Sequence, residues 1–305
     1  MILVQRAPAY ATVQDLGRIG FRASGVPASG AMDRIALATL NVLVGNNRTD
    51  AGIEMALTGG AFVFDSASVF AVGGVEISAT LNGTSIEAYR VYRANEGETL
   101  GIEKISGGRF AYLVVGGGIE TPVVLSSRST YSTGGFGGLH GRRLKSGDEL
   151  PVGNRKSARK HQVMDSLPQT LRPPASTNEI RFILQPDVDA EEIAGDYRLS
   201  LSSDRTGYRL EGNSRPAGAS VTSEPVCPGA IQLPRSGEPI VLMADAPTIG
   251  GYRVMGGVIT ADLGILGQKN PGDAIVLVPI SVERAMREND RLAEIGTLIE
   301  EWCLG

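Results

Sequence analysis

The chain contains one unit of sequence twice, and this repeat constrains its fold more than any other feature. The cluster RIGFR at 18–22 is matched almost two hundred residues later by RTGYR at 205–209. Two further matches follow in the same order: VGGGI at 115–119 against MGGVI at 255–259, and LKSGD at 144–148 against QKNPGD at 268–273. Matches in one order indicate a tandem duplication, which predicts two domains of the same architecture.

Glycine content and short apolar runs predict that these domains consist mainly of strands. Forty of the 305 residues are glycine, which is 40/305 or about 13%, against a usual share of about 7%. The glycines punctuate apolar runs of strand length, as expected for many tight turns. The runs predicted as strands are Ala61–Ala71, Ile86–Arg93, Thr99–Ile105, Phe110–Val115, Arg181–Leu184, Pro239–Met243, Val254–Thr260 and Ala274–Val278.

Two helices and one linker interrupt the predicted strands. Asp33 is placed to cap a helix over 34–44, which ends at Gly45. Apolar residues recur at helical spacing over 281–302, and this helix either packs back on a barrel or docks a partner. The basic and then proline-rich stretch 155–178 has the composition of a linker. We therefore predict an N-terminal barrel over 1–160, a linker over 161–178, and a C-terminal barrel with its helix over 179–305.

Bulk properties exclude several classes of function. A net charge of -4 gives no electrostatic footprint for nucleic acid. Two cysteines and two histidines lack the spacing of a zinc site or a disulfide framework, so no metal site is predicted. No apolar stretch approaches eighteen residues, which predicts a soluble, cytoplasmic protein.

Seven ordered motifs resemble one family over most of the chain, from Val13 to about Val278. They are VQDLGRIGFRASGVPASGAMD at 13–33, Asn41 with LVGN at 43–46, SSRST at 126–130, GRRLKSGD at 141–148, DRTGYRLEG at 204–212, GAIQLP at 229–234, and GGY with ADLGILGQKNPGD at 250–273. This set is similar to the family of the bacterial 5-oxoprolinase C subunit, also called KipA or allophanate hydrolase subunit 2. The family is in turn similar to part of the carboxyltransferase region of urea carboxylase.

The resemblance implies a fold and a reaction. The fold is a pair of tandem cyclophilin-like antiparallel β-barrels. The reaction is the ATP-dependent opening of 5-oxoproline to glutamate, carried out with two partners, a KipI-like B subunit plus a separate A subunit. The chain has no GxxxxGK[ST] phosphate loop, so ATP either binds in an unfamiliar way between the proteins of this complex or is held by one of the partners.

Two other functions remain open on the sequence. The first is a carboxyltransferase component that receives carboxybiotin and passes the carboxyl group to a urea-like or amide nitrogen. The chain has no Met-Lys-Met sequence, so biotin would have to be carried by a partner chain. The second is a regulator that binds a KipI-like partner without catalysing a reaction.

The first half of the chain contains the residues that we expect to be catalytic. Asp33 lies at a predicted helix N-terminus, where it is either a catalytic carboxylate or only a cap. Arg128 could hold a substrate carboxylate with two hydrogen bonds, or form a structural ion pair. Ser29 and Ser127 supply hydroxyl groups next to them and are predicted to bind substrate.

A glycine-rich loop and several unrepeated residues complete the candidate site. Gly135, Gly138 and Arg142 belong to the loop at 134–143, which could close over an anion or nucleotide or be only a mobile loop. Unrepeated polar residues are more informative for chemistry than repeated ones, and Gln232, Tyr252 and Gln268 are expected to bind substrate at a barrel mouth. The repeated pairs Asp15…Arg18 and Asp204-Arg205 are interpreted as structural locks.

Two departures from the family pattern raise doubt about the substrate. Relatives commonly have glycine where this chain has Ser126, and proline where it has Arg253. Proline fixes φ and removes a donor, so Arg253 changes both the backbone preference and the charge of its motif.

Overall fold

The computed structural model describes residues 1–154, 166–173, 177–212 and 220–304. Strands account for 38% of the structure and helices for 17%, which confirms the prediction of a mainly β protein. The chain divides into two compact units, and each is described separately below. Unit 1 comprises Met1–Arg18, Ser29–Pro174 and Ile295–Gly305, and unit 2 comprises Ile19–Ala28 and Ala175–Glu294.

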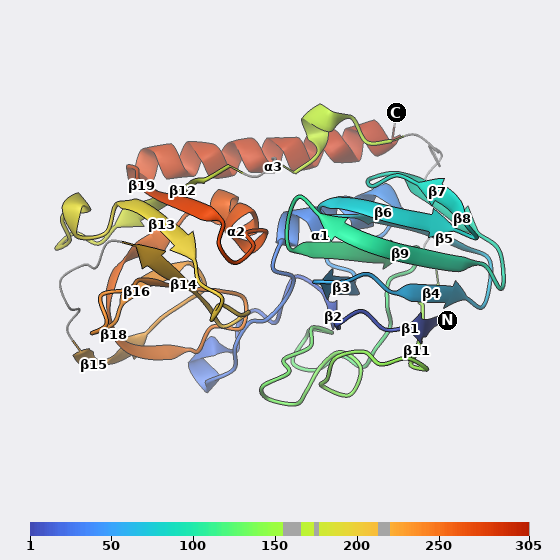
Figure 1. Cartoon of the computed structure of the whole chain (residues 1–305), viewed down its shortest axis with the longest axis horizontal. Coiled ribbons are helices and arrows are strands. Elements are labelled where there is room, and N and C mark those ends of the chain that lie inside the picture. The colour runs from blue at the N-terminus through green and yellow to red at the C-terminus, as the bar shows by residue number, and fades with distance from the viewer. Residues whose placement is uncertain (155–165, 174–176, 213–219, 305) are drawn as a thin grey trace. The chain divides into compact units, whose positions relative to one another are not determined.

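Unit 1 contains two open sheets within the described residues (Figure 1). The six-stranded sheet has the order β11 (Glu149–Leu150), β1 (Ile2–Arg6), β4 (Ala61–Phe64), β9 (Thr99–Ser106), β6 (Glu76–Leu81) and β7 (Thr84–Ile86). The five-stranded sheet has the order β2 (Tyr10–Gln14), β3 (Gly52–Ala56), β10 (Phe110–Val115), β5 (Ser68–Gly73) and β8 (Val91–Ala94).

The two sheets share one hydrophobic core. Side chains from the six-stranded sheet, including Phe62 and Leu100, form a single cluster with Ile53, Met55 and Leu113 from the five-stranded sheet. All five are fully buried. Because alternate residues of a strand point to opposite faces, residues 54 and 112 lie on the other face of the five-stranded sheet.

Helix α1 (Arg34–Leu43) packs on β10 and β5 of that sheet. Its start is fixed by Asp33, whose Oδ1 accepts a hydrogen bond of 3.0 Å from the Ala36 N–H. Its end is followed by Gly45 with φ +82°. The cap, the helix and the stop predicted from the sequence are therefore confirmed.

Unit 2 contains a closed barrel of seven strands. The strands have the order β12 (Glu179–Leu184), β19 (Ala274–Pro279), β13 (Gly195–Leu199), β14 (Gly207–Gly212), β17 (Ile240–Leu242), β16 (Ala230–Leu233) and β18 (Ile249–Val258). The pairing of β12 with β18 closes it, and β15 (Ser220–Pro225) extends beyond β18. Strands β12 and β19 are parallel, and the other strand pairs of this barrel are antiparallel, in agreement with the mainly antiparallel barrel that the resemblance implies.

Two further helices follow the barrel strands. Helix α2 (Thr260–Gly267) leads from β18, and helix α3 (Val282–Leu304) is the C-terminal helix predicted over 281–302. The apolar run 254–260, predicted as a strand, is divided between β18 and the start of α2. None of the helices in the described part of the chain is both long enough and apolar enough to cross a membrane.

Within the described residues, three short 3-10 helices complete the elements: η1 (Arg22–Ser24), η2 (Gln169–Leu171) and η3 (Ala190–Glu192). The predicted linker, 161–178, falls partly outside the described residues, which resume at Ser166. Ser166 forms an isolated bridge with Arg90, and η2 follows it.

The turns before β11 and β19 have the same geometry, as expected for a duplicated unit. Gly147 and Gly272 both have φ +90°. In the first turn the Lys145 N–H donates to Asp148 Oδ2 at 2.7 Å, and in the second the Asn270 N–H donates to Asp273 Oδ2 at 2.7 Å. The repeated glycine and aspartate therefore perform the same structural task in both units.

Candidate functional site

A buried carboxylate, Asp15, organises the SSRST segment of unit 1. Asp15 follows β2, and its Oδ1 accepts hydrogen bonds from the hydroxyls of Ser127 (2.7 Å) and Ser129. Its Oδ2 accepts from the backbone N–H of Arg128 at 2.6 Å. These contacts fix three consecutive residues, 127–129, so Asp15 determines where the chain presents Arg128.

The Arg128 side chain already has protein partners. Its guanidinium donates to the backbone carbonyl of Thr121 and lies 3.7 Å from a carboxylate oxygen of Glu120. The side chain nevertheless keeps 27% of its exposure. Arg128 is therefore a partly accessible cation whose position is fixed by the protein.

A second loop, Ser29–Asp33, runs beside the first. The Ala31 N–H donates to the Asp15 carbonyl oxygen at 2.9 Å. Gly30 has φ +93°, and a Cβ atom there would lie 2.8 Å from the Gly17 nitrogen, so only glycine fits this approach. Ser29 is buried with φ +54°. The left-handed backbone at Ser29 carries a conformational cost. Its buried hydroxyl has no hydrogen-bond partner among the described residues, which costs further free energy.

The structure thus brings four of the predicted site residues onto two adjoining loops of unit 1. Ser29 and Asp33 belong to one loop, and Ser127 and Arg128 belong to the other. Asp15 links the loops through its carboxylate on one side and its carbonyl oxygen on the other. We call these two loops the Asp15 site.

The backbone N–H of Asp33 is fixed by two buried residues that the sequence did not lead us to expect. The Asp33 N–H donates to the Tyr112 hydroxyl at 2.8 Å, and this hydroxyl donates to Glu54 Oε2 at 2.9 Å. Burial, followed by the negative charges of Glu54 and Asp33, raises the pKa of Tyr112 well above its ordinary value. Tyr112 therefore remains a hydrogen-bond donor at neutral pH. A signal for this pair was present, because Glu54 interrupts the otherwise uncharged strand GIEMA.

Arg18, from the first copy of the repeated cluster, is fully buried next to the same site. It donates to the Ser129 carbonyl oxygen, and its guanidinium lies 4.9 Å from the centre of the Phe136 ring. Arg18 therefore joins the SSRST segment to the glycine-rich loop. This contact agrees with a structural role for the repeated arginines.

The glycine-rich loop packs against the SSRST segment. Gly138 has φ +52°, and a Cβ atom there would lie 1.9 Å from Thr130 Oγ1. The Gly138 N–H donates to the Arg128 carbonyl oxygen at 2.8 Å. Gly135 has φ +68° but faces open space. Backbone conformation and close packing thus account for these two glycines.

Arg142, the cation predicted for this loop, forms a two-pronged ion pair. Its Nη1 and Nη2 donate to the Asp148 carboxylate at 2.7 and 2.8 Å. These hydrogen bonds raise the pKa of Arg142 and lower that of Asp148. The charge of Arg142 is therefore neutralised within the chain.

The remaining predicted residues belong to unit 2. Gln232 is buried on β16, and its Nε2 donates to the Tyr252 carbonyl oxygen at 3.3 Å. The Tyr252 side chain is exposed. Gln268 follows α2, and its N–H donates to the Gly264 carbonyl oxygen at 3.1 Å. The structure therefore brings Gln232 to Tyr252, whereas Gln268 takes part in ending α2.

Two unrepeated aspartates of unit 2 hold arginines. Asp245 forms a buried ion pair with Arg205 at 2.9 Å. Asp262 receives three hydrogen bonds from Arg181: one from its backbone N–H at 2.7 Å and two from its guanidinium at 2.6 and 3.0 Å. Both aspartates therefore have a structural task.

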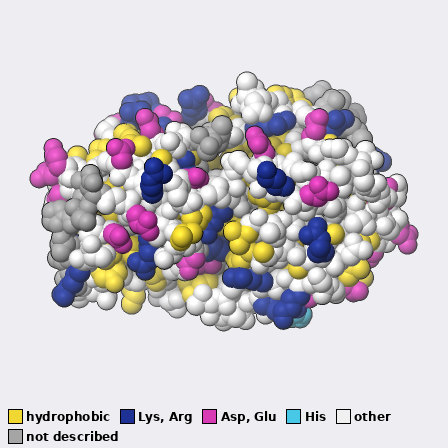
Figure 2. Space-filling view, viewed as in Figure 1, with side chains coloured by type: hydrophobic (Ala, Val, Ile, Leu, Met, Phe, Trp, Pro, Cys, Tyr) yellow, Lys and Arg dark blue, Asp and Glu magenta, His cyan; other side chains and the backbone are white. Residues whose placement is uncertain are grey.

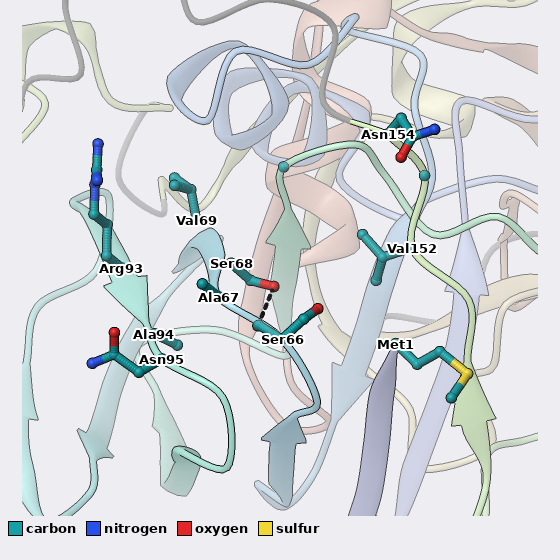
Figure 3. Close-up of a pocket in the computed structure, with 12 residues that line it drawn as sticks. Met1, Ser66, Ala67, Ser68, Val69, Arg93, Ala94, Asn95, Val152 and Asn154 are labelled. Carbon is teal, nitrogen blue, oxygen red and sulfur yellow. Dashed lines mark hydrogen bonds between the residues drawn. The ribbon is translucent and has the colours of Figure 1, made fainter.

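The described pockets do not contain the predicted site. One pocket of about 490 Å³ lies in unit 1, and its lining includes Ser66, Ser68, Arg93, Asn95 and Asn154 (Figure 3). None of the predicted site residues lines it. On the face of the molecule in Figure 2, basic and acidic side chains are interspersed.

The two departures from the family pattern have local explanations. Leu125 and Ser126 are the central residues of a tight turn, with φ +52° and +61°. The Val124 N–H closes the turn by donating to the Ser127 carbonyl oxygen at 2.8 Å. Arg253 donates to the Glu192 carboxylate at 2.9 Å and to the Asp187 carbonyl oxygen at 2.7 Å, so it joins β18 to the loop around η3.

Replacing Ser126 with glycine is expected to stabilise the protein by up to about 1 kcal/mol. A left-handed residue with a side chain costs about 1–2 kcal/mol, and the greater freedom of glycine in the unfolded chain offsets part of the gain. Urea unfolding would measure the change as a higher midpoint at constant slope. Ser127→Gly is the matched control, because it removes a hydroxyl bonded to Asp15 and should lower the midpoint. A lower midpoint for Ser126→Gly would contradict the prediction.

Comparisons with known proteins identify the family of the chain. The model of the carboxyltransferase domain, subdomain A and B, matches residues 24–279. The chain is 36% identical to the 5-oxoprolinase C subunit of Escherichia coli over 94% of each chain. It is 34% identical to the 5-oxoprolinase C subunit of Haemophilus influenzae over 99% of each chain.

A solved structure agrees with these matches. The crystal structure of the Kluyveromyces lactis urea amidolyase superposes with a TM-score of 0.85 and 29% identity, covering 96% of this chain and 20% of that one. The chain thus spans about a fifth of that protein. These findings, taken with the motifs and the closed barrel, show that the chain belongs to the family of the carboxyltransferase domain, subdomain A and B.

Proposed function

We propose that the chain is the C subunit of an ATP-dependent 5-oxoprolinase, which opens 5-oxoproline to glutamate together with an A subunit plus a KipI-like B subunit. One observation carries the proposal. The two relatives named as 5-oxoprolinase C subunits match over 94% and 99% of both chains, whereas the chain matches only a fifth of the urea amidolyase. The chain therefore matches these two C subunits over nearly their full length.

The Asp15 site supports this chemistry. Opening a lactam requires a group that manages protons at the ring nitrogen or the attacking water, and a cation that orients the substrate carboxylate. Asp33 supplies a carboxylate and Arg128 supplies a partly accessible cation, on loops tied together by Asp15. We assign proton transfer to Asp33, substrate binding to Arg128, and a hydrogen bond to the substrate to the Ser29 hydroxyl. The Ser127 hydroxyl is bonded to Asp15 and helps to position Arg128.

Gly138 and Arg142 of the glycine-rich loop are already engaged within the chain, which favours a nucleotide site elsewhere. Gly138 is needed where Thr130 leaves no room for a side chain, and Arg142 is paired with Asp148. A phosphate cradle requires backbone N–H groups directed outward and a free cation. The Gly138 N–H instead donates to the backbone carbonyl oxygen of Arg128. We therefore propose that ATP is held by a partner protein, and we derive no step of the reaction through this loop.

The test is reconstitution. The chain would be co-purified with the A and B subunits, and glutamate released from 5-oxoproline in the presence of ATP would be measured. Turnover that requires all three subunits is the expected result. No turnover with the three subunits assembled would overturn the proposal, and binding to the KipI-like partner without turnover would instead support a regulator.

A second function has its own support in the likeness to the urea amidolyase. In that case the chain would transfer a carboxyl group from biotin to a urea-like or amide nitrogen, with biotin attached to a partner chain. A biotinylated carrier and urea would be added to the same assembly, and the carboxylation would be followed with and without avidin. Carboxylation that avidin abolishes would favour this function over lactam hydrolysis.

A further inference from the structure

Two buried residues on neighbouring strands support the loop that carries Asp33. Glu54 of β3 and Tyr112 of β10 lie directly opposite each other in the sheet register, so their side chains emerge on the same face. Both are fully buried. Tyr112 is also opposite Gly73 of β5. A glutamate in the middle of a buried strand is unusual and calls for a partner or a task.

The partners of this pair are backbone groups of the loop. Glu54 Oε2 accepts from the Met32 N–H at 2.7 Å and from the Tyr112 hydroxyl at 2.9 Å. The Tyr112 hydroxyl accepts in turn from the Asp33 N–H at 2.8 Å. Two consecutive N–H groups, immediately before α1, are therefore fixed from the sheet. The Asp33 carboxylate caps a different N–H group, that of Ala36.

We infer that Glu54 and Tyr112 are positioning residues, which set the orientation of the Asp33 carboxylate in the Asp15 site; the inference rests on the proposed function. The Asp33 side chain begins at a Cα atom that lies between the fixed N–H and the first turn of α1. A shift of this atom moves the carboxylate relative to Arg128, and displacements of about 1 Å can cost about 100-fold in rate. The pair acts through Asp33 and does not itself touch the substrate.

The alternative is that the pair stabilises the fold and nothing more. A buried ionised group is costly, and apolar residues of similar size often stabilise a protein as well or better. Stability alone therefore does not require a glutamate at position 54. A matched control is available in Met55, the next residue of β3, which points into the core between the sheets and is also fully buried.

The experiment compares variants in the complex assembled with the A and B subunits, below the melting temperature of every variant. Glu54→Leu removes the acceptor of the Met32 N–H, and Tyr112→Phe removes the acceptor of the Asp33 N–H. Glu54→Gln keeps an acceptor, and Met55→Ala perturbs only the core. Hydrogen–deuterium exchange of peptides covering residues 29–36 would report on the loop, while kcat and KM for 5-oxoproline would report on the site.

We expect Glu54→Leu and Tyr112→Phe to speed exchange in this segment and to lower kcat at least tenfold, with KM within about twofold. Glu54→Gln should restore part of the lost kcat, and Met55→Ala should leave both kcat and loop exchange unchanged. The inference is overturned if Met55→Ala lowers kcat as much as Glu54→Leu does, or if loop exchange is unaffected by Glu54→Leu. Absence of turnover in the unsubstituted complex would refute the proposed function, and loop exchange would still decide the inference.

Discussion

Replacing Asp33 with asparagine is expected to lower kcat of the proposed 5-oxoprolinase complex by about 10²- to 10⁴-fold, the usual contribution of a general acid or base. The fold should persist, because asparagine caps a helix about as well as aspartate does. The substitution thus separates the two tasks of this residue: the cap to the Ala36 N–H survives, and the proton-accepting carboxylate is lost. Turnover and thermal unfolding would be measured on the same preparation.

Two controls separate chemistry from stability. Asp33→Ala removes both tasks and should also lower stability by about 1 kcal/mol through the lost cap. Ser281→Ala removes a different cap, at the start of α3, where the Ser281 hydroxyl accepts from the Arg284 N–H at 3.3 Å. It should lower stability without changing kcat. If Asp33→Asn retained the full kcat, Asp33 would be a helix cap only and its catalytic assignment would be wrong.

Local signals in the sequence sufficed for one helix of the fold and failed for another. Helix α1 has a cap, an apolar stripe and a glycine stop, all of which act within a dozen residues. Helix α2 has none of these. It is buried on nearly all sides and contains Gly264 and Gly267, so its apolar residues show no helical period and the run into it resembled a strand. Tertiary packing rather than local preference determines this helix.

The candidate site shows the same division. Asp33 and Arg128 could be proposed from motifs, because each lies in a short segment with a recognisable composition. The residues that position them could not be predicted in this way. Asp15 bonds residues more than a hundred positions away, and Glu54 contacts Tyr112 across a strand pair. Such contacts depend on register and loop path, which no local window contains. A lone charge within an apolar strand, as at Glu54, is the signal to use in related sequences.

The repeated arginines Arg18 and Arg205 both have hydrogen-bond partners within the chain, although these partners differ from those expected. The sequence suggested that each arginine pairs with the acid beside it. In unit 2, Arg205 instead binds Asp245, forty residues away, while Asp204 accepts from the Thr206 N–H at 2.7 Å. In unit 1, Arg18 binds the Ser129 carbonyl oxygen. The two units therefore keep a buried arginine at the same place and satisfy it in different ways.

Replacing Arg205 with methionine is expected to destabilise the protein by about 3–5 kcal/mol, because it leaves the Asp245 carboxylate buried without its cation. Both side chains of the pair are only 9% exposed. Chemical unfolding would measure the loss. Arg142→Met is the matched control: it breaks an equally well-formed pair whose side chains are 33% and 13% exposed, and it should cost about 1 kcal/mol or less.

The double variant Arg205→Met with Asp245→Leu gives the decisive comparison. If the single variant is costly because a charge is left unpaired, removing the second charge should recover much of the lost stability, since apolar replacements of buried pairs are often neutral. If the double variant is instead as unstable as the sum of the single variants, the two residues act independently and the pair is not the cause. Recovery would mean that Arg205 is needed in unit 2 because it neutralises Asp245. A search for catalytic residues in unit 2 should then begin outside this pair.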